Sequence, residues 1–338
     1  MARRVVTVFG GSGFIGRHLV RRLTQDGAMV RVCVRDTEDA AFLKTMGDIG
    51  QVVLIPTNVT DSAQVSEALR GADEAVNLVG LLSEWGKQTF KNIHVDAAAN
   101  IARAAKDNGV KRLVHISAIG ADEKSASAYA RTKAAGEAAV KAAFPDATIV
   151  RPSVVFGPED RFFNLFASMT RFSPVLPVFG CPVIPKVTVC ACQGREPGID
   201  FYGEGGTRMQ PLFVGDLARA ITGALADSGS NGVTYELGGA EAYSFKQLME
   251  MTLEASARKR LLVPIPFFWI SFWAWFLQKW PAPLMTCDQV ELLKSDNVVD
   301  GNMPGLADLG ISPVSVRSVL PTYLSRFRPQ TADLARSL

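Results

Sequence analysis

The chain has 338 residues, of which 48% are hydrophobic, enough for a substantial core in one large or two ordinary domains. Its 36 basic and 33 acidic residues leave a net charge of +3 without a long basic run, so nothing favours a nucleic-acid partner. Five cysteines are an odd number, which indicates free thiols in a reducing compartment rather than a disulfide framework.

Cysteine and histidine positions give little support to a metal centre. Cys190 and Cys192 could form a metal or redox pair, but no second pair accompanies them. The three histidines are scattered along the chain, at His18, His94 and His115. We therefore expect no metal site, and we interpret the two neighbouring cysteines as thiols of a loop strand.

The stretch over residues 5–16 predicts the start of a dinucleotide-binding fold, because an apolar strand passes through a glycine turn directly into a helix. Gly10 allows a tight turn, Gly13 lets the backbone approach a pyrophosphate, and Gly16 lets the helix pack closely against the strand. The helix over residues 14–23 then presents free N–H groups to the phosphates. The residues expected at this helix start are Phe14, Ile15 and Gly16.

A second strand, over residues 28–34, ends at Arg35, which bears on the choice between NAD and NADP. At this position an acid binds the 2′-hydroxyl of NAD, whereas an arginine accommodates the 2′-phosphate of NADP. Arg35 therefore favours NADP, although Asp36 beside it could support NAD or cap the turn that follows. Arg17 is either a second phosphate contact or an ordinary solvated charge.

Strands and helices then alternate at short spacing, which predicts an α/β fold with a doubly wound parallel sheet and helices on both faces. The expected strands occupy residues 51–55, 75–80 and 111–117, and a long helix covers residues 90–108. Asn58 and Val59 follow the third strand at the carboxyl edge of the sheet and are expected near the adenine. Val79 and Gly80 end the fourth strand, where the glycine lets the backbone run beside the cofactor.

Tyr129 and Lys133 lie four residues apart on the next expected helix and therefore share one helix face. A lysine ammonium beside a phenol stabilises the phenolate, so a group with an ordinary pKa of about 10 can transfer a proton nearer neutral pH. The spacing alone is weak, but its place directly after the fifth strand of a dinucleotide fold makes it much stronger.

These motifs resemble the extended or atypical branch of the short-chain dehydrogenase/reductase superfamily over most of residues 4–240. The stretches that carry the resemblance are residues 10–16, 129–133 and 150–158. It implies a Rossmann-like fold in which Tyr129 is the acid/base and Lys133 lowers its pKa and holds the nicotinamide ribose. Pro152 and Val154 would line the nicotinamide.

Ser117 is the third candidate catalytic residue, and here the chain departs from the family pattern. The extended branch usually has Ser or Thr two residues further along, where this chain has Ile119. Side chains alternate along a strand, so the Ser117 hydroxyl can point elsewhere. A missing oxyanion donor would weaken carbonyl reduction without weakening cofactor binding.

The C-terminal third contains a strongly aromatic stretch. No charged residue occurs from residue 261 through 278, and four of the five tryptophans lie within residues 269–280. Pro264 and Pro266 leave only about a dozen residues for a regular helix, too few to span a bilayer. Since tryptophan prefers the headgroup layer, we expect residues 261–285 to contact a membrane or a hydrophobic partner, with burial in a core as the alternative.

The nucleotide motif and the aromatic segment together resemble the NAD(P)-binding accessory subunits of respiratory complex I, of the alpha-subcomplex subunit 9 type. The supporting stretches are residues 77–80, 114–122, 129–133 and 210–218. The resemblance implies tightly held NADPH in a structural role and peripheral-arm subunits as partners, near the membrane and the quinone-binding region. Without room for a transit peptide before the first strand, we expect a bacterial protein on the cytoplasmic side of the inner membrane, equivalent to the matrix side.

Two other functions stay open. An NADPH-dependent reductase, dehydratase or epimerase would use Tyr129 and Lys133 and exchange its cofactor during turnover, whereas a regulatory NADP sensor would exchange it without turnover. In either case we expect an NAD(P)-binding domain over residues 1–160 and a smaller C-terminal α/β domain over residues 161–330. A mobile tail is expected over residues 331–338.

Overall fold

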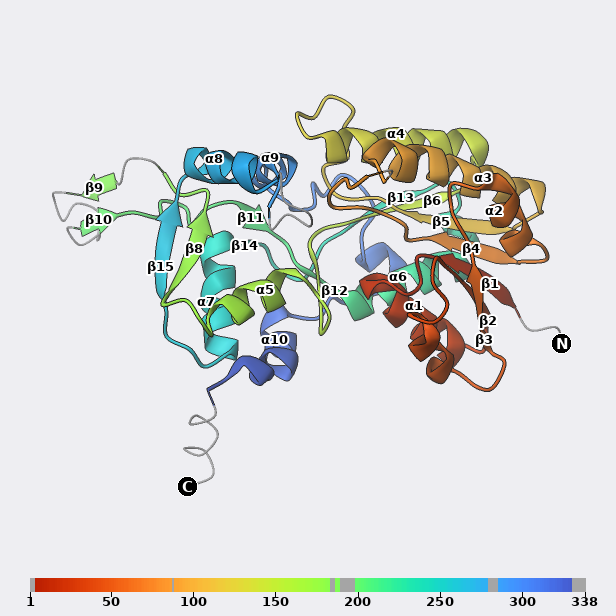
Figure 1. Ribbon diagram of the computed structural model, residues 1–338, viewed down its shortest axis with the longest axis horizontal. Helices are drawn as coiled ribbons and strands as arrows, with labels where there is room; N and C mark the ends of the chain where they lie inside the picture. Colours follow the sequence, from red (N-terminus) through yellow and green to blue (C-terminus); the bar gives the residue numbers. More distant parts are fainter. Residues whose placement is uncertain (1–3, 87, 183–185, 189–197, 279–284, 330–338) are drawn as a thin grey trace, which may run out of the picture. The chain divides into compact units, whose positions relative to one another are not determined.

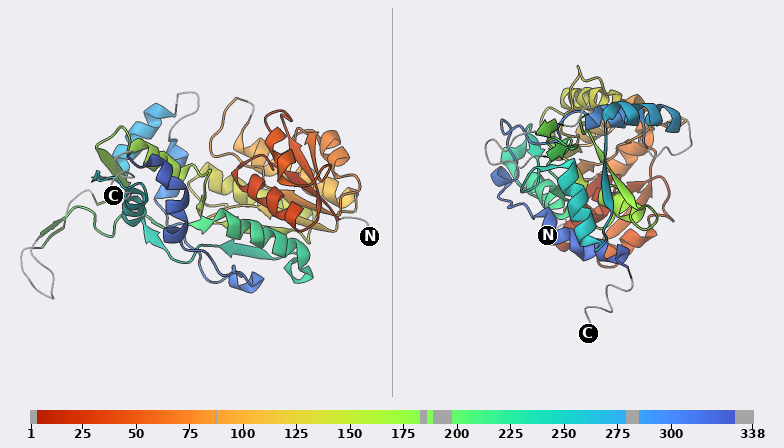
Figure 2. Two further views of the ribbon diagram at one scale, coloured as in Figure 1. Left: turned by 90° about the horizontal axis from the view of Figure 1, so that it is seen from below. Right: turned by 90° about the vertical axis from the view of Figure 1, so that its left-hand side faces the viewer.

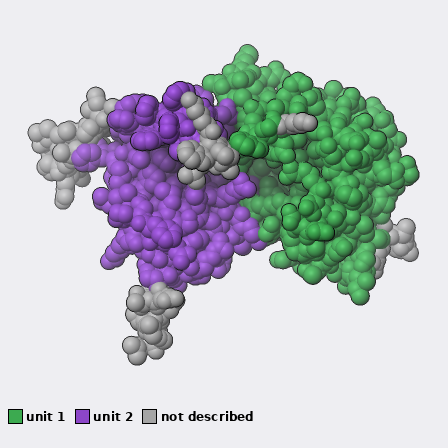
Figure 3. Space-filling view, in the orientation of Figure 1, with its two compact units in different colours: residues 1–153, 212–238, 299–313 green, residues 154–211, 239–298, 314–338 purple. Residues whose placement is uncertain are grey.

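The computed structural model describes residues 4–86, 88–182, 186–188, 198–278 and 285–329. The chain divides into two compact units, which Figure 3 shows in green and purple. Unit 1 consists of residues 1–153, 212–238 and 299–313, and unit 2 consists of residues 154–211, 239–298 and 314–338. The sequence pattern predicts one boundary after residue 160, whereas the units interleave along the chain because the last strand of the unit 1 sheet comes from residues 234–237.

Unit 1 is built on a seven-stranded sheet in the order β13-β6-β5-β4-β1-β2-β3, and every neighbouring pair is parallel. The strands are β1 (Val5–Phe9), β2 (Met29–Val34), β3 (Val52–Pro56), β4 (Glu74–Asn77), β5 (Arg112–Ile116), β6 (Thr148–Pro152) and β13 (Thr234–Leu237). The order reverses between β1 and β4, as it does at the ligand-binding point of doubly wound sheets. The predicted fold class is confirmed.

Helices cover both faces of this sheet (Figures 1 and 2). Its helices are α1 (Phe14–Gln25), α2 (Ser62–Leu69), α3 (Ala97–Asp107), α4 (Ala128–Ala143) and α6 (Val214–Ala226). Helices α1 and α6 pack together on one face, whereas α2, α3 and α4 pack side by side on the other. Apolar side chains of α2, α3 and α4 bury the sheet on that side, with Ile101, Leu113 and Ile149 fully enclosed. This core holds the carboxyl ends of β4 and β5 in fixed positions.

One helix of unit 1 begins irregularly. The helix expected over residues 90–108 starts as a π-helix over Lys91–Asp96, here called the π turn, and continues as α3. α3 ends at Asp107 with Asn108 as its C-cap, and Gly109 after it has a φ of +71°, as expected for a glycine that follows a helix end. π-helical turns are rare and are often found at functional sites.

Unit 2 is a smaller α/β body made mostly of short elements. Its strands are β7 (Val155–Phe156), β8 (Val175–Phe179), β9 (Lys186–Thr188), β10 (Gly198–Asp200), β11 (Arg208–Met209), β14 (Tyr243–Ser244) and β15 (Leu261–Ile265). Its helices are α5 (Phe162–Met169), α7 (Phe245–Ala255), α8 (Phe267–Leu277), α9 (Cys287–Leu293) and α10 (Val316–Leu324). β8 and β15 pair in parallel, and α7 packs on β8. Within residues 180–206, β9 and β10 form an antiparallel pair.

The aromatic stretch forms α8 directly after β15, close to the length that its prolines allow. Only Ile270 and Ala274 of this helix are buried. Six large aromatic side chains are 51% to 58% exposed: Phe268, Trp269, Phe272, Trp273, Trp275 and Phe276. None of the helices in the described ranges is long and apolar enough to cross a membrane.

Candidate dinucleotide site

The glycine turn after β1 leaves the start of α1 open to an anion. Gly10 has a φ of +80°, a conformation that side chains rarely adopt, and a Cβ atom at Gly16 would lie 2.5 Å from the Gly10 carbonyl oxygen. Gly13 is the N-cap of α1 and supplies no side-chain cap, and the first turn holds no acidic residue. The first N–H groups of α1, at Phe14 and Ile15, can therefore bind a pyrophosphate.

The turns after β1 and β4 meet where the strand order reverses. A Cβ atom at Gly10 would lie 3.3 Å from the backbone of Leu78 and Val79. The Val79 N–H donates a hydrogen bond to Asn77 Oδ1 at 3.0 Å, which fixes the turn after β4. The structure thus brings two of the expected cofactor residues, Gly10 and Val79, together.

The residues that follow β2 differ in what their side chains do. Arg35 comes directly after the strand and is exposed. Asp36 Oδ1 accepts hydrogen bonds from the backbone N–H groups of Glu38 at 2.8 Å and Asp39 at 3.3 Å. Asp36 is therefore engaged in a turn, and the exposed guanidinium next to it is the side chain available to a ribose phosphate.

The other residues expected around the adenosine half have mixed surroundings. Arg17 Nη2 donates to the Ser12 carbonyl oxygen at 3.4 Å, and its guanidinium carbon lies 5.0 Å from the centroid of the Phe42 ring. Asn58 is exposed and caps its own turn, with Oδ1 accepting a backbone N–H at 3.1 Å. Val59 packs against the core of unit 1, so its side chain is partly used by the fold.

Helix α4 presents the expected tyrosine and lysine together. Lys133 is 5% exposed, and its Nζ donates to the Ile116 carbonyl oxygen at 3.1 Å, at the end of β5. This Nζ lies 5.9 Å from the centroid of the Tyr129 ring. The Tyr129 ring lies edge-on to the rings of His94 and Phe90, with centroid distances of 5.3 and 5.9 Å. Both side chains are thus held by neighbours before any ligand binds.

Burial lowers the pKa of Lys133 toward neutral pH. Desolvation lowers the pKa of Lys133 to about 8, while the carboxylate of Glu137 raises it. Ser117 is 3% exposed, and its Oγ has no hydrogen-bond partner within the described residues. Ile119 supplies no hydroxyl, so Tyr129, Lys133 and Ser117 are the polar groups that could act on a carbonyl here.

Two histidines that look scattered in the sequence converge on Lys133. His94 Nε2 accepts the Leu81 N–H at 3.0 Å, and His115 Nδ1 accepts from Asn77 Nδ2 at 3.0 Å. Burial, followed by the charge of Lys133, lowers the pKa of each histidine to about 3. Both rings are therefore neutral. Sequence reasoning missed them, and the available signal was their place within an apolar helix face and an apolar strand.

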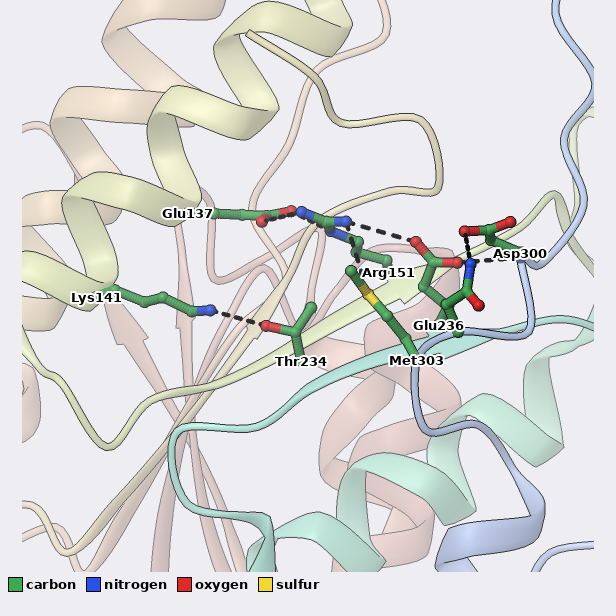
Figure 4. Close-up of polar contacts among 8 residues, drawn as sticks. Glu137, Lys141, Arg151, Thr234, Glu236, Asp300 and Met303 are labelled. Carbon is green, nitrogen blue, oxygen red and sulfur yellow. Dashed lines mark hydrogen bonds and ion pairs between the residues drawn. The ribbon is translucent and has the colours of Figure 1, made fainter.

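A largely buried ion cluster joins α4 to strands β6 and β13 of the sheet (Figure 4). Arg151 binds Glu137 through Nη2 at 2.8 Å and through Nε at 2.9 Å, and Glu236 through Nη1 at 3.5 Å. The Asp300 N–H donates to Glu236 Oε2 at 3.3 Å. Hydrogen bonding to Glu137 raises the pKa of Arg151. Because Glu137 lies one helical turn after Lys133, the cluster fixes the helix that carries the lysine.

The two residues expected at the nicotinamide fall into different units. Pro152 ends β6 in unit 1 and is buried. Val154 begins unit 2, and its N–H donates to Asn297 Oδ1 at 3.0 Å. Each is fixed within its own unit.

Cysteines and acidic residues form no metal centre among the residues that the structure describes, where no group of three potential ligands occurs. Cys33, Cys181 and Cys287 are free thiols, and burial raises the pKa of Cys33 to about 12. Cys190 and Cys192 lie outside the described residues.

Known proteins resemble the chain in sequence, and solved structures resemble it in fold. It is 32% identical over 326 residues to NADH dehydrogenase [ubiquinone] 1 alpha subcomplex subunit 9 of Mus musculus, covering 96% of this chain and 80% of the relative. It is 38% identical over 178 residues to the ceramide reductase of Caulobacter vibrioides, covering 52% and 54% of the two chains. The UDP-glucose 4-epimerase of Thermus thermophilus with NAD shares the fold, with a TM-score of 0.66, 20% identity, and 96% and 99% of the chains covered.

The family model that describes NAD dependent epimerases and dehydratases matches residues 6–238, from β1 through β13. This range contains the glycine turn, the strand-order reversal and the Tyr129 to Lys133 helix. The family description supports a nucleotide cofactor for this chain. The chain belongs to the NAD dependent epimerase/dehydratase family.

Proposed function

We propose that this chain is an accessory subunit of NADH:ubiquinone oxidoreductase that holds NADPH as a structural cofactor, in the peripheral arm near the quinone-binding region. One observation carries the proposal: the similarity to the mouse subunit 9 runs over 96% of this chain and therefore includes both units. The UDP-glucose 4-epimerase that shares the fold also covers 96% of the chain, but at only 20% identity, so the 32% identity over both units carries the proposal. The open start of α1 and the exposed Arg35 support the cofactor.

The test is to identify the proteins that co-purify with the chain. We would purify it from its native membranes in mild detergent, identify the co-purifying proteins by mass spectrometry, and release any nucleotide by denaturation. Stoichiometric recovery of quinone-reductase subunits together with NADPH is the expected result. Recovery of the chain alone, as a monomer or homodimer, would contradict the proposal.

Arg35 is proposed to select NADPH over NADH. An arginine that binds a phosphate makes a charge-assisted hydrogen bond, and losing one typically weakens binding by about tenfold or more. Arg35→Ser should therefore raise the Kd of NADPH by at least about tenfold and leave that of NADH nearly unchanged. Asp36→Ser is the matched control, which should change the two dissociation constants equally.

Helix α8 is proposed to contact the cytoplasmic surface of the inner membrane as a peripheral anchor. It carries no charge and exposes six aromatic rings, and such rings prefer the headgroup layer. A triple variant with serine at Trp269, Trp273 and Trp275 should bind liposomes of inner-membrane phospholipids at least about tenfold more weakly. Trp85→Ser is the control, because Trp85 is at least as exposed as these three tryptophans but lies in unit 1. Equal binding by both variants would favour a protein partner for α8.

A second function is supported by the match to the ceramide reductase and by the Tyr129–Lys133 pair. The chain would then be an NADPH-dependent reductase, and a ceramide-type carbonyl lipid is the substrate to try first. Cofactor oxidation by the purified chain that Tyr129→Phe abolishes would establish this function and refute the structural role. With no oxidation in either protein, the structural role stands.

A further inference from the structure

His94 connects three separate parts of unit 1 at the nicotinamide end of the candidate site. Its Nε2 accepts the backbone N–H of Leu81, in the turn that follows β4. Its Nδ1 lies 3.1 Å from Thr132 Oγ1 on α4, and Thr132 lies between Tyr129 and Lys133 in sequence. The ring itself is on the π turn and is 2% exposed.

Local packing leaves this ring little freedom. The Phe90 ring stacks on it at a centroid distance of 5.3 Å, and the Tyr129 ring meets it edge-on. A Cβ atom at Gly136 would collide with the His94 carbonyl oxygen, so the π turn and α4 approach each other as closely as backbone allows. The π turn places the ring because each π-helical turn holds more residues than an α-helical turn and shifts the register.

The hydrogen bonds specify one form of the ring. The Leu81 N–H can only donate, so His94 Nε2 accepts. Thr132 Oγ1 lies 2.8 Å from the Ala128 carbonyl, to which it donates, so it accepts from His94 Nδ1–H. A neutral imidazole satisfies both contacts and an imidazolium cannot. Burial lowers the pKa of His94 to about 3, which agrees with this form.

The turn that His94 holds runs next to the tyrosine and lysine. A Cβ atom at Gly80 would lie 3.4 Å from Lys133 Nζ and 3.8 Å from His94 Nε2. The backbone of Gly80 therefore lies within van der Waals reach of the ammonium, and any shift of Leu81 would move this backbone. The geometry of the pair therefore depends on where the turn after β4 is fixed.

We propose that His94 is the positioning residue for the nicotinamide half of the site: it fixes the backbone of Gly80 and Leu81 against α4. Tyr129 and Lys133 then present a preformed surface to the nicotinamide ribose. The inference rests on the proposed NADPH binding and deepens it, since it assigns the two halves of the cofactor to separately fixed parts of unit 1. The adenosine half depends on the glycine turn and on Arg35.

The test compares two ligands on the full-length protein. NADPH occupies both halves of the site, whereas adenosine 2′,5′-bisphosphate occupies the adenosine half alone. His94→Phe keeps a ring but removes both hydrogen bonds, and it should raise the Kd of NADPH by about tenfold or more. The Kd of adenosine 2′,5′-bisphosphate should change by less than about twofold. His94→Gln offers one acceptor and one donor and should restore most of the NADPH affinity.

Thr132→Val provides a second measurement that keeps the side-chain volume and removes the acceptor for Nδ1–H, together with the hydrogen bond that the hydroxyl donates to the Ala128 carbonyl oxygen. It should raise the Kd of NADPH by a smaller factor than His94→Phe does and leave the Kd of adenosine 2′,5′-bisphosphate unchanged. If the His94→Phe protein does not fold, Thr132→Val is the deciding variant. Equal weakening of both ligands, or no change in NADPH affinity, would overturn the positioning role. Failure of the unaltered protein to bind NADPH would instead refute the proposed cofactor, so the two failures are distinguishable.

Discussion

Helix α1 follows β1 after the glycine turn, and helix α8 follows β15 after a single residue. Both helices lack a side-chain cap, yet they leave opposite surfaces open. Helix α1 buries its apolar stripe, including Leu19 and Leu23, in the core of unit 1, so what it leaves open is its polar N-terminal end. Helix α8 has no polar face to leave open, and unit 2 covers only Ile270 and Ala274. The first helix is thus suited to an anionic ligand, and the second to an apolar or interfacial partner.

The same contrast extends to the two units. Unit 1 buries charged and titratable groups, including Lys133, His94 and His115, and gives them specific partners or neutral forms. Unit 2 exposes the aromatic face of α8. If unit 1 is a preorganised binding site and α8 is a contact surface, substitutions in unit 1 should affect stability strongly, and substitutions on α8 should not.

The largest effect is expected at the ion cluster of Figure 4. Arg151→Met would leave the carboxylates of Glu137 and Glu236 without their cation, and their side chains are only 8% and 9% exposed. Removing one partner of a buried pair is strongly destabilising, so the free energy of unfolding should fall by about 3 kcal/mol. Urea denaturation measures this change.

The matched control replaces the acids as well. The triple variant Arg151→Met, Glu137→Gln and Glu236→Gln should recover much of the lost stability, because no buried charge is then left unpaired. A single variant as stable as the unaltered protein would show that the cluster is solvated, and would weaken the contrast between the units.

The next largest effect is expected in the glycine turn. Gly16→Ala would put a methyl group 2.5 Å from the Gly10 carbonyl oxygen, so α1 would have to move, at a cost of about 1–3 kcal/mol and with loss of NADPH binding. Gly13→Ala is the control: its Cβ would lie 3.3 Å from the same oxygen, and the position is exposed. It should lower NADPH affinity with little change in Tm. Loss of Tm in both variants would show that the turn is required for folding alone.

The buried histidines should make unit 1 sensitive to acid. Their pKa values fall from 6.5 to about 3 on folding, mainly by desolvation, so below about pH 6.5 the unfolded chain binds protons that the folded chain does not. Stability is therefore full above that pH and decreases as the pH falls toward 3. Each histidine should lower the free energy of unfolding by about 2 kcal/mol as the pH falls from about 7.5 to about 5.

The measurement is urea denaturation at the two pH values. The stability of His94→Gln should lack the part of the pH dependence that comes from His94. The carboxylates that titrate in the same range contribute equally to both proteins, so their effect cancels in the comparison. The pKa of Lys133, lowered to about 8, lies above this window. An unchanged pH dependence in His94→Gln would mean that His94 is accessible to protons in the folded state.

The parts of the site that sequence reasoning could predict depend on local geometry. The spacing of Gly10, Gly13 and Gly16 and the periods of the flanking strand and helix set the turn through backbone angles and Cβ clashes. Arg35 follows from the end of β2, and Tyr129 and Lys133 follow from helical spacing. None of these predictions needs a contact between distant residues.

The remaining parts depend on contacts across the fold. His94 and Thr132 are 38 residues apart and meet only because a π turn shifts the helix register, which no apolar pattern in residues 90–108 reveals. Arg151 and Glu236 are 85 residues apart and meet because unit 1 takes its last strand from beyond the first segment of unit 2. Pairing of β9 with β10 likewise has no local signal.

The smallest effect on stability is expected on α8. The sequence predicts an apolar helix there, but because the helix has no polar face, its sequence does not predict which side is covered. Trp273 is 57% exposed and Ile270 is 5% exposed. Trp273→Gln should change the free energy of unfolding by less than about 0.5 kcal/mol, whereas Ile270→Ala should cost about 2 kcal/mol. If urea denaturation showed a larger cost for Trp273→Gln, the outer face of α8 would be packed within the chain itself. Its aromatic rings would then belong to the core of unit 2, and α8 would resemble α1 in using its apolar surface for folding.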